Sequence, residues 1–506
     1  MFNILKEKSS MRKLLYTTIL ASSVLLATSC VDLTQEPQSF VTEEDYIALM
    51  DLEGFQKAVS GLYTDLWQGN YGFNCRMQIL SLGGDDIMHS PTKANNAHGY
   101  MDNLNPSLSI NAANFTTSWE FFFKVINNAN KLINNVEIPE GDLKTKYQEA
   151  VGEAYFMRGY AYFCLVRLYG DLPLILKGSD AEGQMPRTAV AEIYSEAIVP
   201  SLEEAIKLLP AKSRSGFSNT ASKWAAKACL ADVYVTMAGW PLKKGQEYYS
   251  KAAETAKDII DNSGLKLTSK YEDLWKEAKK TEANEHMFAI HHDAKQKSAS
   301  NYGKSYYPKD YIPAGWSDYY SEEKFYLDYP EGDRKDWNFM TEWLTGTAAN
   351  SKLTNYKESA DGLPAISKYY DFDNGAPAAS AQANGLTSIY RYADVLLIYA
   401  EASVKATNTV NTMAAKALKD IQERAGSSVI TNTTDPATFE KAVFDEYGWE
   451  FFAEMRRWFQ IVRLEKVGEV NPTKWNNSLF QSNGHYLMPI PENSILLTGW
   501  KNNPGY

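Results

Sequence analysis

Apolar residues recur at three- and four-residue spacing between Asp142 and Leu168, which is the period of a helix with one buried face. Val151 and Leu165 are two members of this apolar stripe. Asp142 is of a residue type that caps helix N-termini, and Gly170 stands just past the last apolar position, where helices commonly stop. The pattern predicts a helix from Asp142 to about Leu168.

The helical period returns in five further segments, four of which pair into two helical hairpins. The segments are Ile193–Leu209, Ala221–Ala238, Tyr248–Ile260, Ser388–Ala406 and Met413–Arg424. The first helix of each hairpin carries the run Ala-Asp-Val, at 231–233 and at 393–395. Paired helices that stack on their neighbours to bury a shared core are typical of tetratricopeptide repeats. We therefore predict an all-α fold with a tetratricopeptide-like (TPR-like) scaffold, whose helical pairs occupy about residues 115–262 and 388–465.

Two stretches, about 82–114 and 266–387, lack the helical period and are rich in Gly, Pro, Asn and Tyr. Between Tyr302 and Trp343, 13 of 42 residues are Phe, Trp or Tyr, against 65 in the whole chain of 506. An irregular stretch this long is usually functional or disordered, and the aromatic content argues against disorder. The sequence thus predicts a loop-rich, aromatic-rich lobe that binds a ligand.

The amino end has the layout of a bacterial export signal. Met11-Arg12-Lys13 is basic, an apolar run extends from Leu14 to Ala27, and small residues lead into Cys30. This resembles a lipobox, although most lipoboxes carry Leu where Ala27 stands. We expect residues 1–29 to be removed before Cys30, with translation starting at Met1 or Met11. Acyl chains on Cys30 would then hold residues 30–506, one domain, on a membrane.

Charge and cysteine content narrow the function classes. The net charge of −11 becomes about −14 without the signal, which contributes +3, and so acidic a protein is not expected to bind nucleic acid. Cys75, Cys164 and Cys229 form no CxxC pair, which excludes the usual zinc and redox signatures. Cys164 and Cys229 lie in apolar helical patterns and are expected in the core.

Several motifs together resemble the SusD/RagB family of nutrient-binding outer-membrane lipoproteins, over essentially all of the mature chain. Tyr447 stands where that family usually has Arg, and Gln460 where it usually has Asp. The motifs are Glu153–Arg158, Leu168–Leu174, Arg391–Ala402, Arg424-Ala425-Gly426, the acid- and arginine-bearing segment Glu446–Arg463, Pro489-Ile490-Pro491 and the terminal Asn503-Pro504-Gly505-Tyr506.

This resemblance implies an all-helical protein that is lipid-anchored in the outer membrane and faces the cell exterior. It implies a binding protein and no enzyme, with an oligosaccharide or polysaccharide as ligand. It also implies a partner, a SusC-like TonB-dependent outer-membrane transporter that receives the captured nutrient. No cofactor is implied, and calcium has no support beyond a weak loop motif at 371–375.

Candidate ligand contacts follow from sugar chemistry, because aromatic faces stack on the C–H face of a pyranose while polar side chains bond its hydroxyls. In the family, the aromatic residues that bind ligand come from two loop regions at about the positions of the candidates below. The family pattern is not strict there, so no individual residue can be assigned from it. The candidates are Tyr302, Tyr306, Tyr307, Trp316, Tyr319 and Tyr320, with Tyr100, His98 and Asn103 as an opposing wall. The other interpretation is that these rings pack the core of the irregular lobe.

Three other functions compete with glycan capture. The scaffold could bind peptides, it could be an adaptor whose aromatic residues contact only the transporter, or it could hydrolyse glycosides. Hydrolysis needs two carboxylates about 5–10 Å apart beside the sugar. The nearby acids are Glu322, Glu323, Asp328, Asp333 and Asp336. Asp328–Arg334 resembles a structural turn of the family, which makes catalysis the weaker hypothesis. His291-His292-Asp293 is a poor metal motif, because neighbouring residues of a strand face opposite ways.

Overall fold

The computed structural model describes residues 43–66, 76–93, 96–177, 185–282, 285–293, 302–310, 315–347, 349–371 and 384–506. Cys30 and Cys75 lie outside these residues. The chain falls into two units, Met1–Tyr46 and Ile47–Tyr506, and the short helix α2 (Glu43–Ala48) spans the junction. The fold described below is that of the second unit.

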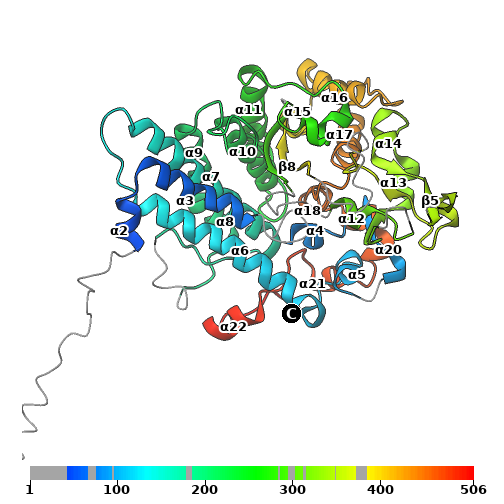
Figure 1. Cartoon of the computed structure of the whole chain (residues 1–506), viewed down its shortest axis with the longest axis horizontal. Coiled ribbons are helices and arrows are strands. Elements are labelled where there is room, and N and C mark those ends of the chain that lie inside the picture. Colours follow the sequence, from blue (N-terminus) through cyan, green and yellow to red (C-terminus); the bar gives the residue numbers. More distant parts are fainter. Residues whose placement is uncertain are drawn as a thin grey trace, which may run out of the picture. The chain divides into compact units, whose positions relative to one another are not determined.

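Long helices build the scaffold, and the first group packs around α7 (Lys144–Tyr169) (Figure 1). Helices α3 and α6 pack on α7, as does α9. Most residues of α7 are buried, including Phe156, Met157 and Tyr162, because neighbours cover it on several sides. The other long helices of this group are α3 (Leu52–Leu66), α6 (Leu108–Asn135), α9 (Val199–Leu208), α10 (Lys223–Ala238) and α11 (Gln246–Asn262).

The second group centres on α15 (Tyr392–Thr407), which packs against α11 and α16 (Thr412–Arg424). Helices α17 (Pro436–Glu450) and α18 (Arg457–Arg463) complete this group. The predicted helical pairs are thus present as α10–α11 and α15–α16, and the all-α, TPR-like fold class is confirmed.

Some predicted helix boundaries were wrong. The helix expected from Asp142 begins at Lys144, and no side chain caps it. The segment predicted as Ile193–Leu209 is divided into α8 (Val190–Ile193), a π-helical turn (Tyr194–Ile198) and α9. Ser388–Arg391, expected to open a helix, is extended and pairs with another strand.

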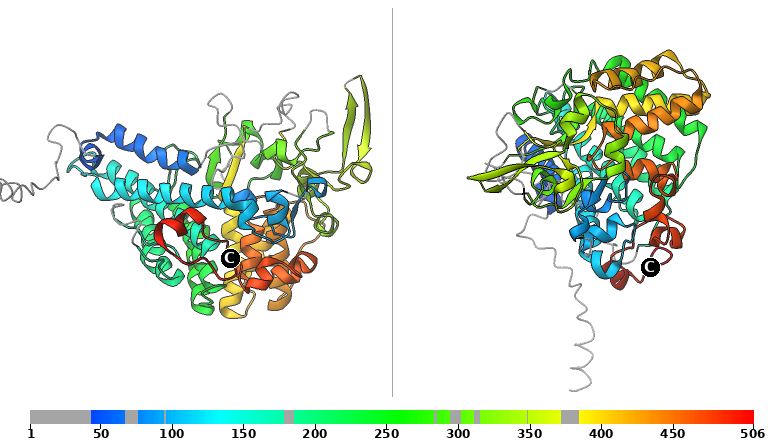
Figure 2. Two further views of the ribbon diagram at one scale, coloured as in Figure 1. Left: turned by 90° about the horizontal axis from the view of Figure 1, so that it is seen from below. Right: turned by 90° about the vertical axis from the view of Figure 1, so that its right-hand side faces the viewer.

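In the described part of the irregular stretches and at their ends, the strands form four two-stranded antiparallel ribbons. The hairpin β5–β6 projects away from the helices (Figure 2). The ribbons are β1 (Ile87–His89) with β3 (Tyr319–Ser321), β2 (His286–His291) with β8 (Leu386–Arg391), β4 (Phe339–Met340) with β7 (Ala365–Ile366), and β5 (Glu342–Thr347) with β6 (Asn350–Asn355).

Short helices fill the remaining connections. The α-helical ones are α4 (Met77–Leu80), α5 (Ala97–Asp102), α12 (Tyr302–Tyr306), α13 (Glu323–Asp328), α14 (Asp333–Asn338), α19 (Val467–Val470), α20 (Pro472–Trp475), α21 (Leu479–Asn483) and α22 (Glu492–Thr498). The 3-10 turns are η1 (Pro91–Lys93), η3 (Tyr271–Leu274), η4 (Glu277–Lys279) and η6 (Tyr356–Glu358).

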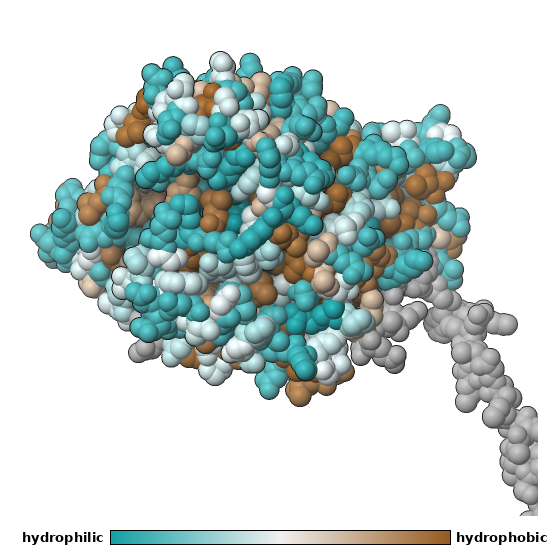
Figure 3. All heavy atoms as spheres, turned by 180° about the vertical axis from the view of Figure 1, so that it is seen from behind, coloured by the Kyte–Doolittle hydropathy of each residue, from teal (hydrophilic) through white to brown (hydrophobic). Residues whose placement is uncertain are grey.

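One continuous apolar core joins the two helical groups, and it includes Cys164 and Cys229, both fully buried as expected. A second small core lies in the loop-rich lobe around Tyr320, Trp343 and Tyr356. The face drawn in Figure 3 is mostly hydrophilic, with hydrophobic side chains in small separate patches. Within the described part of the chain, no helix has the length and apolarity that a membrane span requires.

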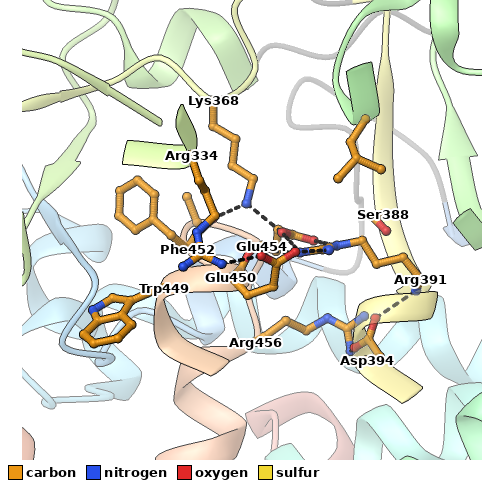
Figure 4. A network of polar contacts seen from close by, with 12 residues as sticks. Arg334, Lys368, Ser388, Arg391, Asp394, Trp449, Glu450, Phe452, Glu454 and Arg456 are labelled. Atoms are coloured by element: carbon orange, nitrogen blue, oxygen red, sulfur yellow. Dashed lines mark hydrogen bonds and ion pairs between the residues drawn. The ribbon is translucent and has the colours of Figure 1, made fainter. Parts of the chain in front are cut away.

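A buried network of charges fastens the lobe to the scaffold (Figure 4). Arg334 and Lys368 come from the lobe, and they reach Glu450 at 2.5 Å and Glu454 at 2.6 Å respectively. Arg391, at the end of β8, binds both carboxylates. Burial alone would raise the pKa of Glu450, but the guanidinium groups of Arg424, Arg391 and Arg334 lower it well below its usual value. Glu450 therefore stays ionised.

Glu153 and Arg158, two buried charged residues of α7, do not pair with each other. Glu153 forms an ion pair with Arg214 at 2.7 Å, whereas Arg158 donates to Asn130 and Ser201, which are neutral. An ion pair thus compensates the burial of Glu153, whereas hydrogen bonds to neutral side chains compensate that of Arg158.

Candidate functional site

The pairing of β1 with β3 brings the two irregular stretches together. His89 lies opposite Tyr319 in this ribbon, although they are far apart in sequence. As a result α5, which carries His98 and Tyr100, lies beside the segment that carries Trp316. We use the name aromatic face for His98, Tyr100 and Trp316, which these two neighbouring segments carry.

His98 connects the two halves of the aromatic face. Its Nδ1 lies 2.7 Å from the Tyr319 hydroxyl, and the two rings stack with centroids 5.6 Å apart. The centre of the His89 ring lies 5.3 Å from that of His98 and 5.9 Å from that of Tyr319, so the three rings form one cluster. Burial, reinforced by His89, lowers the pKa of His98 to about 4. The imidazole is therefore neutral at pH 7, where it can accept or donate hydrogen bonds without charge.

Trp316 is half-buried, and its backbone is held on both sides. The backbone N–H of Trp316 donates to the Lys304 carbonyl at 2.7 Å, and the backbone carbonyl of Trp316 accepts from the Lys93 ammonium. Lys93 is in turn paired with Asp318 at 3.1 Å. The Lys304 ammonium lies 5.0 Å from the centre of the indole, within cation–π range. The indole is thus a fixed and partly exposed ring with a cation beside it.

Tyr100 lies on α5, and Asn103 directly follows the last residue of that helix. Tyr100 is 36% exposed, so its ring is open to a ligand. Asn103 is exposed as well, but its amide donates to the Gly99 carbonyl at 2.8 Å and supports the end of α5. Asn96 caps the other end of the helix by accepting from the backbone of His98. These caps fix the helix that positions Tyr100.

Four of the predicted ligand contacts are buried. Tyr306, Tyr307, Tyr319 and Tyr320 are each at most 2% exposed. Tyr306 packs between Tyr319 and Tyr369, with ring centroids 5.7 and 5.8 Å away. The Tyr320 hydroxyl donates to Ser317 at 2.9 Å. This burial favours the packing interpretation for the four rings, and their contact with a ligand stays a prediction.

Tyr302 begins α12, but its side chain lies outside the described part of the chain. Sequence reasoning missed the polar residues that surround Trp316. Lys304 lies within the aromatic-rich stretch, but a single lysine there carries no sequence signal for a ligand site. Asp361 accepts from Ser90 at 2.5 Å and from Thr92 at 2.8 Å, and so holds the loop between β1 and α5. Only the fold shows that contact, because no local pattern links 361 to 90.

The histidine motif at 291–293 does not converge. His291 bonds Ser218 at 2.8 Å, while His292 bonds Thr387 at 2.7 Å. Among the residues that the structure describes, no three His, Cys, Asp or Glu side chains gather as metal ligands would. Of the faint calcium motif, Asp371 accepts from the Glu277 backbone at 2.8 Å, and Phe372–Gly375 lies outside the described residues.

Comparison with known proteins gives two family matches in sequence order. A model described as "Starch-binding associating with outer membrane" matches residues 40–235, and the model of the SusD family matches residues 284–506. SusD-like protein P2 of Formosa agariphila is 28% identical over 525 residues, which cover 96% of this chain and 98% of that protein.

Solved structures share the fold. A SusD superfamily protein from Parabacteroides distasonis superposes with a TM-score of 0.76 at 23% identity, over 90% of this chain and 98% of that one. A laminarin-binding SusD-like protein superposes with a TM-score of 0.70 at 19% identity, over 90% and 99%. Because family matches, a full-length relative and the TPR-like fold agree, the chain belongs to the SusD/RagB family.

Proposed function

We propose that this protein captures an oligosaccharide on the aromatic face and passes it to a partner outer-membrane transporter. The observation that carries the proposal is the junction of two distant segments at His98 and Tyr319. The segments joined there carry a partly exposed indole, an exposed tyrosine and a neutral histidine. Flat rings with nearby neutral polar groups suit a pyranose, which has an apolar face and a hydroxyl rim.

Family membership supports the class of ligand. The laminarin-binding neighbour has the same scaffold, and one matching family model is described as starch-binding. Which glycan this chain takes is set by its own loop residues, because structural likeness at 19% identity carries the fold alone.

The cellular setting is part of the proposal. We expect acylated Cys30 to anchor the protein in the outer membrane, in keeping with the family description of association with that membrane. We expect a SusC-like TonB-dependent transporter as the partner that takes up the bound ligand. Neither step requires chemistry on the ligand, so we propose a binding protein and no enzyme.

Two of the five carboxylates suspected of hydrolysis, Glu322 and Asp328, have cationic partners that disfavour catalysis. Glu322 is paired with Lys474, and Asp328 with Lys324 on α13. A hydrolase needs one carboxyl group with a raised pKa opposite an ionised one across the sugar. Burial raises the pKa of Glu322, but the ammonium of Lys474 opposes the shift.

The test is calorimetry and native affinity gels on the purified protein with starch, laminarin, xylan, pectin and mucin glycans, and with peptide mixtures as a second arm. Binding of one glycan class without release of shorter products supports the proposal. Binding of peptides alone overturns it in favour of the peptide hypothesis. Release of shorter sugars overturns the non-enzyme assignment.

Matched variants locate the site. Trp316→Ala should weaken glycan binding about tenfold, which corresponds to the loss of about 1.4 kcal/mol of stacking. Trp224→Ala is the control, since Trp224 is also half-buried and has lysine ammoniums 5.5 Å from its ring, but lies on α10. Equal affinity of both variants would remove Trp316 from the site.

A further inference from the structure

A cavity of about 920 Å³ lies apart from the aromatic face, between α13 and the helices α17 to α20. Every residue that lines it belongs to the described part of the chain. Its volume falls within the range of small-molecule sites, about 300–1,000 Å³. The proposed function does not use this cavity, which we call the charged cavity.

Trp449 is the aromatic side chain that the charged cavity leaves available. Phe325 is only 7% exposed, and Phe444 is covered by Arg457 at 4.2 Å and Lys466 at 4.9 Å. Trp449 is half-buried, and its indole points away from the buried charge network (Figure 4). Within the described residues, the indole N–H has no hydrogen-bond partner. A ring with a spare donor is a suitable platform for a ligand that has both an apolar face and polar edges.

The charges that line the cavity are already neutralised in pairs. Each lining cation lies against a carboxylate, so the cavity offers donors and acceptors without a strong field of one sign. The pairs are Lys324–Asp328, Lys441–Asp445 at 2.5 Å, Lys405–Glu440 at 2.6 Å, Lys466–Glu469 at 2.9 Å, Arg457–Asp85 at 2.5 Å and Lys474–Glu322.

This chemistry selects among ligand classes. A phosphate or another anion would need an unpaired cation, and a metal ion would need converging free carboxylates. A protein segment is disfavoured, because interface cores are depleted in Lys, Glu and Asp, which dominate here. Neutral hydroxyl-rich ligands fit, since each hydroxyl can donate to a carboxylate and accept from an ammonium.

We propose that the charged cavity is a second saccharide site, in which Trp449 stacks against a sugar ring and the surrounding ion pairs bond its hydroxyls. The proposal rests on the proposed function for its ligand class. Lys474 connects the two sites, because its ammonium binds Glu322 in the cavity and Asp102 of α5 at 2.7 Å. Asp102 also accepts from the backbone of His89 at 3.1 Å, beside the aromatic face. Two sites on one polysaccharide would raise its overall affinity above that of either alone.

The experiment is photo-crosslinking of the purified protein with diazirine-labelled oligosaccharides from the same five glycans, followed by digestion and mass spectrometry. We expect crosslinks in two regions, around residues 98–103 and 315–320, and around 322–328 and 437–449. Crosslinks confined to the first region would overturn the second site and leave the proposed function intact. Crosslinks confined to the second region would support the cavity and overturn the assignment to the aromatic face.

Variants separate binding from folding. Trp449→Ala should remove the crosslinks in the cavity and weaken binding of long chains about tenfold, while Trp449→Phe retains a ring and should keep most of both. The Trp449 carbonyl, which accepts from the Tyr329 hydroxyl at 2.6 Å, is present in both variants. Unchanged cavity crosslinks in a folded Trp449→Ala protein would overturn the role of Trp449, and absence of all crosslinks would overturn both sites.

Discussion

Arg391 and Glu454 lie 63 residues apart in the chain, yet the guanidinium of Arg391 donates hydrogen bonds of 3.1 and 2.9 Å to the carboxylate of Glu454. Neither side chain is more than 1% exposed. The same guanidinium also reaches Glu285 at 2.9 Å. Because a buried charge is tolerated only when it is paired, these residues fix how β8 and the turn that follows α17 meet.

Loss of Arg391 should therefore be severe. We expect Arg391→Met to lower the free energy of unfolding by about 3–5 kcal/mol, because buried carboxylates are left without their cation. Urea denaturation followed by circular dichroism measures the change. The control is Lys324→Met, which breaks an ion pair whose side chains are 85% and 58% exposed and should stay within about 0.5 kcal/mol. Equal stability of the two variants would show that the network is not structural.

Alanine substitutions of Tyr320 and Trp316 should affect different properties, the first the stability of the fold and the second the affinity for glycan. Tyr320 is 2% exposed and packs in the small core with Trp343, so Tyr320→Ala should lower the free energy of unfolding by about 3–5 kcal/mol. Trp316→Ala should weaken glycan binding with a much smaller effect on stability. Melting temperatures and calorimetric affinities of both variants check this. A Tyr320→Ala protein that melts like the wild type and no longer binds glycan would restore Tyr320 to the ligand site.

Gly315 positions Trp316 through a close backbone approach. A Cβ at Gly315 would collide with the carbonyl oxygen of Tyr307, so Gly315→Ala must displace this loop. We expect weaker glycan binding and a loss of about 1–3 kcal/mol of stability. Gly61→Ala is the control, since Gly61 lies in α3 with nothing within 4 Å of an added Cβ. That change should stabilise the protein by about 0.5–1 kcal/mol.

His286 should make the protein sensitive to acid. Burial lowers its pKa from 6.5 to about 4, and its ring bonds the Leu274 carbonyl at 3.1 Å and the Ser388 hydroxyl at 3.3 Å. The unfolded chain therefore binds this proton more readily than the folded one between pH 6.5 and 4. The stability that neutral, buried His286 contributes is fully present above about pH 6.5 and is lost as the pH falls toward 4.

The variant His286→Gln isolates this histidine from the other titrating groups. Between pH 7 and pH 4.5 the wild type should lose about 2–3 kcal/mol more stability than His286→Gln, at about 1.4 kcal/mol per pH unit. Denaturant unfolding at several pH values gives the two curves. Parallel curves for the two proteins would contradict the assigned pKa of His286.

The scaffold could be predicted because its signals are local. The apolar stripe around Leu165 and the stop at Gly170 lie within a few turns of each other, and the observed helix ends at Tyr169. Strand β8 was mistaken for the start of α15, because an apolar run directly before a helix has the same pattern as the helix itself. Only the pairing with β2 makes this run extended. Short strands depend on distant partners, which a single sequence does not reveal.

The ligand site was harder to predict because the lobe has a core of its own. Tyr319 and Tyr320 were both predicted as ligand contacts, and as neighbours on β3 their side chains point to opposite faces. In the structure Tyr319 joins the main core and Tyr320 joins the small core, and both are buried. A count of aromatic residues cannot separate rings that pack inside from a ring such as Trp316 that remains partly open.

The pairing of His291 with Leu386 holds the two ends of residues 292–385 side by side. The segment that carries Trp316 therefore leaves the scaffold and returns to it at one place. We call residues 292–385 the cassette. Because the entropy of closing a loop grows slowly with its length, such a cassette can be lengthened or exchanged with little penalty to the helices. A replacement must keep counterparts of Arg334 and Lys368 for Glu450 and Glu454. Chimaeras that exchange this cassette between relatives, with those two cations retained, should keep the scaffold and carry over the donor's choice of ligand.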